Sequence, residues 1–204
     1  MPEGQHALEP APRAHASAAE FDYQPTLRGQ LLQLRPLRAD DFGDLFAVAS
    51  DPRLWEGHPQ RTRYQPEVFA AFFREALASG GALVAADADS GLLIGSSRYH
   101  DYRADRSEVE IGWSFLSRSH WGGRYNAEMK ALMLRHAFRF VTAVVFLVDP
   151  GNLRSQRALQ KIGAVLQGRR HDYLRRERLC FRIAAAEWSQ RATDPGAAAR
   201  APPA

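Results

Sequence analysis

Residues 108–141 restrict the possible folds of this chain more than any other stretch, because their hydrophobic period changes part-way along. Apolar side chains first alternate with polar or small ones, which is the period of a strand with one apolar face: Val109, Ile111, Trp113 and Phe115. They then recur at helical spacing: Tyr125, Met129, Leu132, Met133, His136 and Phe140. Gly122 and Gly123 lie at the change. The sequence therefore predicts a strand, a tight glycine turn and a long helix.

A helix that begins directly after two glycines can bind an anion. Its first backbone N–H groups have no carbonyl partner within the helix, and they carry the positive end of the helix dipole. Phosphate is the usual anion at such a place. The alternative is a plain strand-to-helix turn without a ligand.

The rest of the chain supplies short periodic segments on both sides of this unit. Strands are expected at residues 30–37, 82–86, 92–99, 144–148, 164–173 and 178–184, and helices at 42–49, 66–79 and 152–162. The order β-α-α-β-β-β-α-β-α-β-β predicts an α/β (α+β) domain, with a mixed, mostly antiparallel central sheet flanked by helices. Residues 1–25 and 190–204 lack such periodicity and are expected to be flexible tails around one domain at residues 26–189.

Charge and cysteine content narrow the class of protein. The net charge is +4, which is too modest to indicate a nucleic-acid partner, so no DNA is expected. Cys180 is the single cysteine and lies in an apolar strand-like run, which predicts a buried, inert thiol and no internal disulfide. Neither metal-type Cys/His spacing nor an apolar run of membrane-spanning length occurs. Without a secretory signal pattern, a cytoplasmic protein without metal or membrane is expected, as a monomer or homodimer.

Three segments together resemble the GCN5-related N-acetyltransferase (GNAT) superfamily, and within it the ribosomal-protein N-terminal acetyltransferase type. The first is Ser119 to Arg124 (SHWGGR), which is similar to the phosphate loop of the superfamily. The second begins at Asn152 (NLRSQRALQKIGA), and the third is the closing strand that leads into Glu187 and Trp188. The order and spacing of the three carry the resemblance, because single glycine motifs are common by chance.

Two residues depart from the pattern of the superfamily. Ser119 stands where glutamine or arginine is usual, and Arg124 stands where the second glycine normally lies. The loop acts through backbone N–H groups, so these changes leave its expected role in place. Arg124 can also add a cation for the phosphates.

The resemblance implies acetyl-CoA as the donor and assigns its site. The diphosphate is expected at the start of the central helix, and the pantetheine arm at the end of the central strand and at the later Asn helix. The implied residues are Phe115, Leu116, Trp121, Gly122, Gly123, Arg124, Tyr125, Asn126, Asn152 and Ser155. For Asn152, capping its helix is a sufficient alternative role.

Direct acyl transfer to an amine needs a base for the amine and a proton for the departing thiolate. Glu110, on the polar side of the central strand, is the candidate base; the alternative is a salt bridge to an arginine. Ser155 is the candidate acid, and its alternative is a structural serine. For Glu128, on the central helix, a structural ion pair is the preferred interpretation.

The acceptor is expected to be a primary amine: a protein N-terminus, a small amine or an amino acid. The loops at residues 55–64 and 99–107 would select it, through His58, Arg61, Tyr64, His100 and Tyr102. An arginine-rich final hairpin is either a solvated face or a dock for an acidic or RNA-bound substrate: Arg169, Arg170, Arg175, Arg176 and Arg178. The alternative function is a catalytically silent GNAT-fold module that binds acyl-CoA, protein or RNA.

Overall fold

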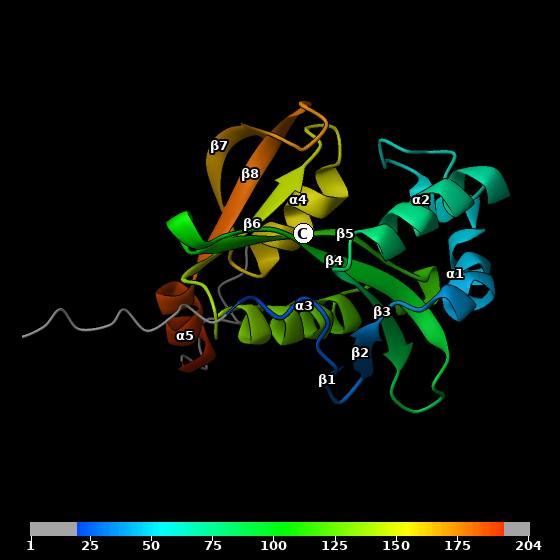
Figure 1. The fold of residues 1–204 in the computed structure, drawn as a ribbon, viewed down its shortest axis with the longest axis horizontal. Coiled ribbons are helices and arrows are strands. Elements are labelled where there is room, and N and C mark those ends of the chain that lie inside the picture. Colours follow the sequence, from blue (N-terminus) through cyan, green and yellow to red (C-terminus); the bar gives the residue numbers. More distant parts are fainter. Residues whose placement is uncertain (1–19, 194–204) are drawn as a thin grey trace, which may run out of the picture.

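A computed structural model describes residues 20–193 and contains one eight-stranded sheet in the order β1-β2-β3-β4-β5-β6-β8-β7 (Figure 1). All neighbouring strands are antiparallel except β5 and β6, which are parallel. The strands are β1 Leu27–Arg28, β2 Leu32–Pro36, β3 Ala82–Asp87, β4 Leu93–Arg103, β5 Glu108–Leu116, β6 Ala143–Val148, β7 Val165–His171 and β8 Glu177–Ala184. The predicted mixed, mostly antiparallel sheet is confirmed.

Helices cover both faces of this sheet. They are α1 Phe42–Ala49, α2 Pro66–Ala78, α3 Arg124–Ala137, α4 Leu153–Lys161 and α5 Ala185–Thr193. On one face α1 and α2 pack against Val84 of β3. On the other face α3 and α4 pack against Leu83 and Ala85 of the same strand. The alternation of neighbouring residues along β3 thus connects two separate cores.

The element order matches the prediction, with additions at the edges. The two-residue strand β1 and the helix α5 were not expected, and β4 continues to Arg103 where a loop was expected. Phe21 is 3% exposed and packs on Tyr99 and His136, so core packing begins before residue 26. At the other end, α5 continues past residue 189. Residues 1–19 and 194–204, which hold most of both expected tails, lie outside the described residues.

A β-bulge interrupts β5 near its C-terminal end. Arg98 of β4 is opposite Gly112, and Ser96 is opposite Phe115, so two residues of β5 face Ser97 alone. One of the two, Trp113, has a φ of 51°. A bulge re-aims the side chains that follow it. Ser114 consequently turns toward α3, where it contacts Lys130.

The strands β5 and β6 pair only over their first three residues. The pairs run from Glu108 with Ala143 to Glu110 with Val145. Beyond Glu110, β5 remains bonded to β4, while β6 remains bonded to β8 as far as Val148. The two strands therefore part and leave an opening in the middle of the sheet.

Glu128 anchors α3 to the N-terminal edge of the sheet. Its carboxylate accepts hydrogen bonds from the backbone N–H groups of Gln30, Leu31 and Leu32 at 2.8, 2.8 and 3.0 Å. Gly29 lies so close that an added Cβ would be 2.5 Å from this carboxylate. The expected ion pair of Glu128 is absent from the described part of the chain, and the backbone amides take its place.

Replacing Glu128 with alanine should destabilise the fold, because three backbone donors at the β1–β2 turn lose a charged acceptor. We expect a loss of about 2–4 kcal/mol in the free energy of unfolding, measured by urea denaturation. Glu128→Gln keeps one acceptor oxygen and should lose less. An unchanged midpoint for Glu128→Ala would show that the turn is held by other contacts.

Candidate active site

A cavity of about 870 Å³ opens where β5 and β6 part. Its walls come from β5, β6, α3, α4 and α2, together with the segment before α2 and the turn of the β7–β8 hairpin. This size suits a cofactor or small-molecule ligand. The opening in the sheet therefore continues into a site that both helical layers border.

One end of the cavity is the predicted glycine turn. Gly122 and Gly123 line it with φ values of 101° and 118°, a region that other residues rarely adopt. Since α3 begins at Arg124, the N–H groups of its first turn have no carbonyl partner within the helix. Asn126 of that turn also lines the cavity. This end, the phosphate end of the cavity, has the backbone donors that a diphosphate needs.

Three cations of α4 also line the cavity. The Arg154 guanidinium lies 4.2 Å from the ring centroid of Trp121 and donates to the backbone oxygen of Leu54 at 3.1 Å. Arg157 and Lys161, both on α4, line the cavity with it. The donor set therefore fits the phosphate groups of a CoA-type ligand.

The wall formed by α4 contains the two residues expected from its sequence. Asn152 caps the helix, with its Oδ1 accepting the N–H of Ser155 at 3.1 Å. Both residues line the cavity. Phe115 and Leu116 line the β5 side. The structure therefore brings these four residues together around one space.

Glu110 presents a free carboxyl group to the cavity. The side chain is 8% exposed, and it forms no hydrogen bond or ion pair with any residue that the structure describes. Burial raises the pKa of Glu110 from 4.5 to about 8. Two residues earlier, Glu108 is paired with Arg170 at 2.7 Å. The alternative salt-bridge role thus belongs to Glu108 and not to Glu110.

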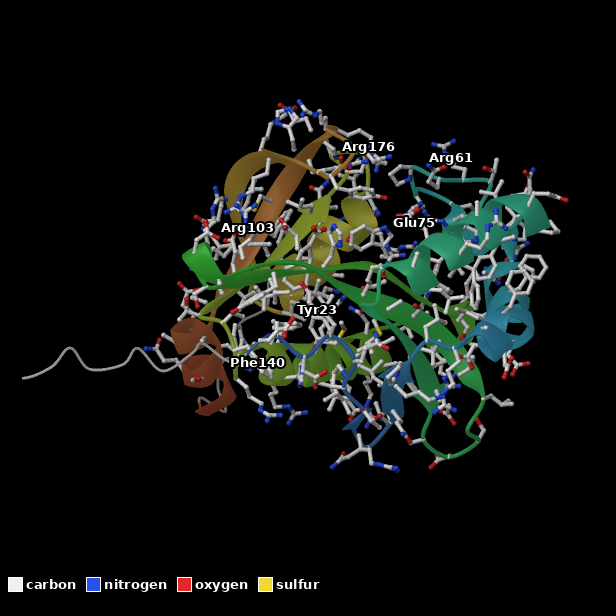
Figure 2. The ribbon with its side chains drawn as sticks, in the orientation of Figure 1. Tyr23, Arg61, Glu75, Arg103, Phe140 and Arg176 are labelled. Carbon is white, nitrogen blue, oxygen red and sulfur yellow. The ribbon has the colours of Figure 1, made fainter. Side chains whose placement is uncertain are left out.

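The part of the cavity between α2 and the turn of the β7–β8 hairpin is its mouth. Figure 2 labels Glu75 on α2 and Arg176 in the hairpin turn. The hydroxyl of Tyr173 donates to Glu75 Oε1 at 2.5 Å. Arg63 stacks on Phe72 and Trp55, 4.3 and 4.9 Å from their ring centroids. Burial lowers the pKa of Arg63 to about 10. The mouth is therefore aromatic, with a guanidinium that stacks on two rings and forms no hydrogen bond or ion pair within the described chain.

The predicted acceptor residues are dispersed. His58 lines the main cavity, and burial lowers its pKa to about 4. Arg61 lines a separate small hollow, and Tyr64 packs against the core beneath α1 and α2. His100 and Tyr102 belong to β4 and not to a loop. His100 packs on Trp113 and Tyr173 behind the mouth, whereas Tyr102 packs on Phe21 on the α3 face, away from the cavity.

Other predicted side chains of the glycine turn point elsewhere. Arg124 is exposed, and Tyr125 donates its hydroxyl proton to Asp87 of β3 at 2.8 Å. Any contact of these two residues with a phosphate would therefore be through their backbone N–H groups or, for Arg124, a free guanidinium. The arginines of the last hairpin are mostly paired with carboxylates: Arg169 with Glu177, Arg170 with Glu108, Arg176 with Asp172, and Arg178 with Asp149 and Asp172.

Four residues of the site were not identified in the sequence: Arg63, Glu75, Lys130 and Tyr173. Glu75 and Lys130 lie on helices beside apolar positions, where a charged side chain is typical of a solvent-facing position. Each of these residues is recognised as part of the site only by the contact that it makes with another helix or strand. The hydrophobic period of a sequence does not reveal such contacts.

The family model described as "Acetyltransferase (GNAT) domain" matches residues 32–165. The chain belongs to the GNAT acetyltransferase family. It is therefore an acyltransferase that uses acetyl-CoA. The search of curated proteins found no match.

Solved structures share the fold. A GCN5-related N-acetyltransferase from Brucella melitensis matches with a TM-score of 0.71 at 17% identity, over 81% of each chain. The acetyltransferase from Agrobacterium tumefaciens str. C58 matches with a TM-score of 0.60 at 26% identity, over 83% of this chain and 99% of that one. Mycobacterium smegmatis RimJ, in complex with CoA-disulfide, matches with a TM-score of 0.57 at 20% identity, over 80% and 87%.

Three further observations concern other chemistry. Among residues 20–193, no group of three or more His, Cys, Asp or Glu side chains is arranged to hold a metal ion. None of the helices in that range is long and apolar enough to cross a membrane. Cys180 is buried, and burial raises the pKa of its thiol.

Proposed function

We propose that this GNAT acetyltransferase moves the acetyl group of acetyl-CoA directly onto an α-amine, either of a protein N-terminus or of a small amine such as an amino acid. The observation that carries the proposal is the opening between β5 and β6, which joins the glycine turn of α3 to the free carboxyl group of Glu110. Phosphate donors and a base thus border one continuous space.

Glu110 is the proposed general base. A general base acts best when its pKa lies near the working pH. The pKa of Glu110, about 8, lies in that range. At the same pH an α-ammonium group, whose ordinary pKa is about 8, also loses its proton, whereas a lysine side chain with a pKa of about 10.4 stays charged. This difference favours α-amines over lysine side chains.

The proposed transfer is direct, with no acyl-enzyme. The amine nitrogen forms a bond to the carbonyl carbon, the carbon–sulfur bond breaks, and Glu110 takes the amine proton. Cys180 is buried in β8 and does not line the cavity, so it is not placed as a nucleophile. Ser155, at the cavity wall, is the proposed hydroxyl that donates a hydrogen bond to the departing sulfur.

A thiol-release assay tests this function. Acetyl-CoA is offered with a panel of peptides that differ at residue 1, with free amino acids, and with N-terminally blocked lysine peptides. We expect thiol release with free α-amines and at least tenfold less with the blocked lysine peptides. If CoA binds in calorimetry and no acceptor gives thiol release, the silent binding module is the better interpretation.

Replacing Ser155 with alanine should lower kcat about tenfold and leave the Kd for CoA nearly unchanged, because one neutral hydrogen bond to the reacting sulfur is lost. The helix cap remains, since Asn152 accepts from the backbone N–H of residue 155. Steady-state kinetics and calorimetry on the same preparation give both values. Equal losses in kcat and affinity would make Ser155 a structural residue.

A further inference from the structure

Lys130 is a buried cation that the proposed reaction has not yet used. It lies on α3 at 5% exposure and lines the cavity. Its Nζ donates to Ser114 Oγ in the β5 bulge and lies 3.4 Å from Ser97 Oγ of β4. The ring of Phe146 on β6 lies 5.6 Å from Nζ. The ammonium group therefore lies beneath the gap between the two strands.

No carboxylate lies within ion-pair distance of Lys130 in the described part of the chain. A buried ammonium without a counter-ion costs free energy of folding, and a hydrophobic side chain of similar volume would be more favourable there. Two serine hydroxyls use two of its three N–H donors and leave one. Stability alone gives no reason for a lysine at this position.

The position of Lys130 along the cavity is also informative. It follows Gly123 by seven residues on α3, which is about 10 Å along the helix axis from the phosphate end. A ligand arm that runs from the glycine turn along β5 reaches Lys130 next to the bulge. The thioester of acetyl-CoA is at the far end of that arm.

Lys130 and Glu110 approach the gap from opposite faces of the sheet. Val109 and Ile111, the neighbours of Glu110, pack in the core under α3, so Glu110 belongs to the α2 face. The bulge turns Ser114 to the α3 face, where Lys130 holds it. An amine that meets Glu110 therefore enters on one face, and a leaving group that meets Lys130 departs on the other.

We propose that Lys130 is a catalytic residue, whose ammonium group donates a proton to the sulfur of CoA as the carbon–sulfur bond breaks. The electron pair of that bond stays on sulfur, the Nζ proton moves to it, and Lys130 becomes a neutral amine that water reprotonates before the next cycle. This inference rests on the proposed function, because it places the thioester at the bulge. Ser155 then supplies a hydrogen bond, since a serine hydroxyl does not release a proton at neutral pH.

The acidity of Lys130 agrees with this role. Burial alone lowers its pKa from 10.5 to about 7. An ordinary thiol has a pKa of about 8.5, so a proton moves from Lys130 to a thiolate without an energetic penalty, whereas an ordinary lysine would hold it.

The chain contains only two lysines, Lys130 and Lys161, which makes a direct test possible. Lysine labelled with nitrogen-15 at Nζ gives two side-chain resonances, which Lys130→Met assigns. Each is followed by NMR in the free protein, with CoA, and with desulfo-CoA, which lacks the thiol. We expect the resonance of Lys130 to differ between CoA and desulfo-CoA, and that of Lys161 to be the same with both. Identical Lys130 resonances with both ligands would overturn the proposal.

The variant Lys130→Met separates a catalytic from a structural role. We expect its Tm to be equal to or above that of the unsubstituted protein, its Kd for CoA to change less than threefold, and its kcat to fall about 100-fold or more. A lower Tm with parallel losses of affinity and kcat, or an unchanged kcat, would contradict the proposal. If Lys130→Met does not fold, this also counts as a structural role.

The two proposals can fail separately. If the unsubstituted protein releases no thiol with any acceptor, the proposed function fails. If it turns over normally while the Lys130 resonance ignores the thiol, only the role of Lys130 fails.

Discussion

Glu110→Gln should lower kcat by about 100-fold to 10,000-fold, because the variant keeps the size of the side chain and removes the carboxyl group that is proposed to accept the amine proton. The change should leave the Kd for CoA within about twofold, since Glu110 lies away from the glycine turn. Thiol release with an α-amine acceptor measures kcat, and calorimetry measures Kd.

Glu108→Gln is a matched control on the same strand. Glu108 is as buried as Glu110, but it is paired with Arg170 and does not line the cavity. The control should lose stability and keep kcat within a few-fold. Similar losses of kcat in both variants would indicate that β5 is disturbed as a whole, and would remove the assignment of the base.

The pH dependence follows from the same carboxyl group and from Lys130. As a base, Glu110 must be ionised, and as the proposed acid, Lys130 must carry its proton, so turnover should follow a bell-shaped pH profile with its maximum between about 7 and about 8. The pKa of Glu110 is raised in the native state, so the native protein retains a proton that the unfolded chain releases. The free energy of unfolding should therefore fall as the pH rises from 4.5 to about 8. Glu110→Gln should remove this component of the stability profile.

Gly122→Val should weaken CoA binding about tenfold to 100-fold. The φ of 101° at Gly122 is unfavourable for a β-branched residue, so the turn must change conformation. Its N–H groups then leave the positions from which they meet a diphosphate, and each charge-assisted hydrogen bond is worth about 1.5–3 kcal/mol. Titration calorimetry with CoA measures the effect.

Gly91→Val is the matched control for this variant. Gly91 has a φ of 73° in the β3–β4 turn, and an added Cβ would meet no atom within 4 Å, as at Gly122. Both variants should lose about 1–3 kcal/mol of stability through backbone strain. Only Gly122→Val should lose affinity for CoA, so an equal loss in Gly91→Val would attribute the effect to stability and not to the turn.

Most of the fold could be predicted because its elements have clear periods and stop signals. The change from period 2 to helical spacing gave β5 and α3, and the apolar run before Asp149 gave β6. The two-residue strand β1 is too short to have a period, and β4 continues through polar residues because its partner β5 holds them. The existence of β1 and the length of β4 therefore depend on pairing with a neighbouring strand, which the local sequence pattern does not show.

The candidate site also contains residues that could be placed from the sequence and residues that could not. Gly122, Asn152 and Ser155 lie in the motifs that carry the family resemblance, and all three line one cavity. Tyr102 was placed in the acceptor region because a loop was expected there, and the strand directs it to the opposite core. A lysine on a helix is typical of a solvent-facing position, but Lys130 lines the cavity where β5 and β6 part.

The most direct test of the account is a crystal structure with CoA bound. We expect the diphosphate to accept hydrogen bonds from the backbone N–H groups at Gly122, Gly123 and the first turn of α3, with the pantetheine arm along Phe115 and Leu116 and the thiol beside the β5 bulge. An empty opening between β5 and β6 at saturating CoA, or CoA bound on another surface, would contradict the account.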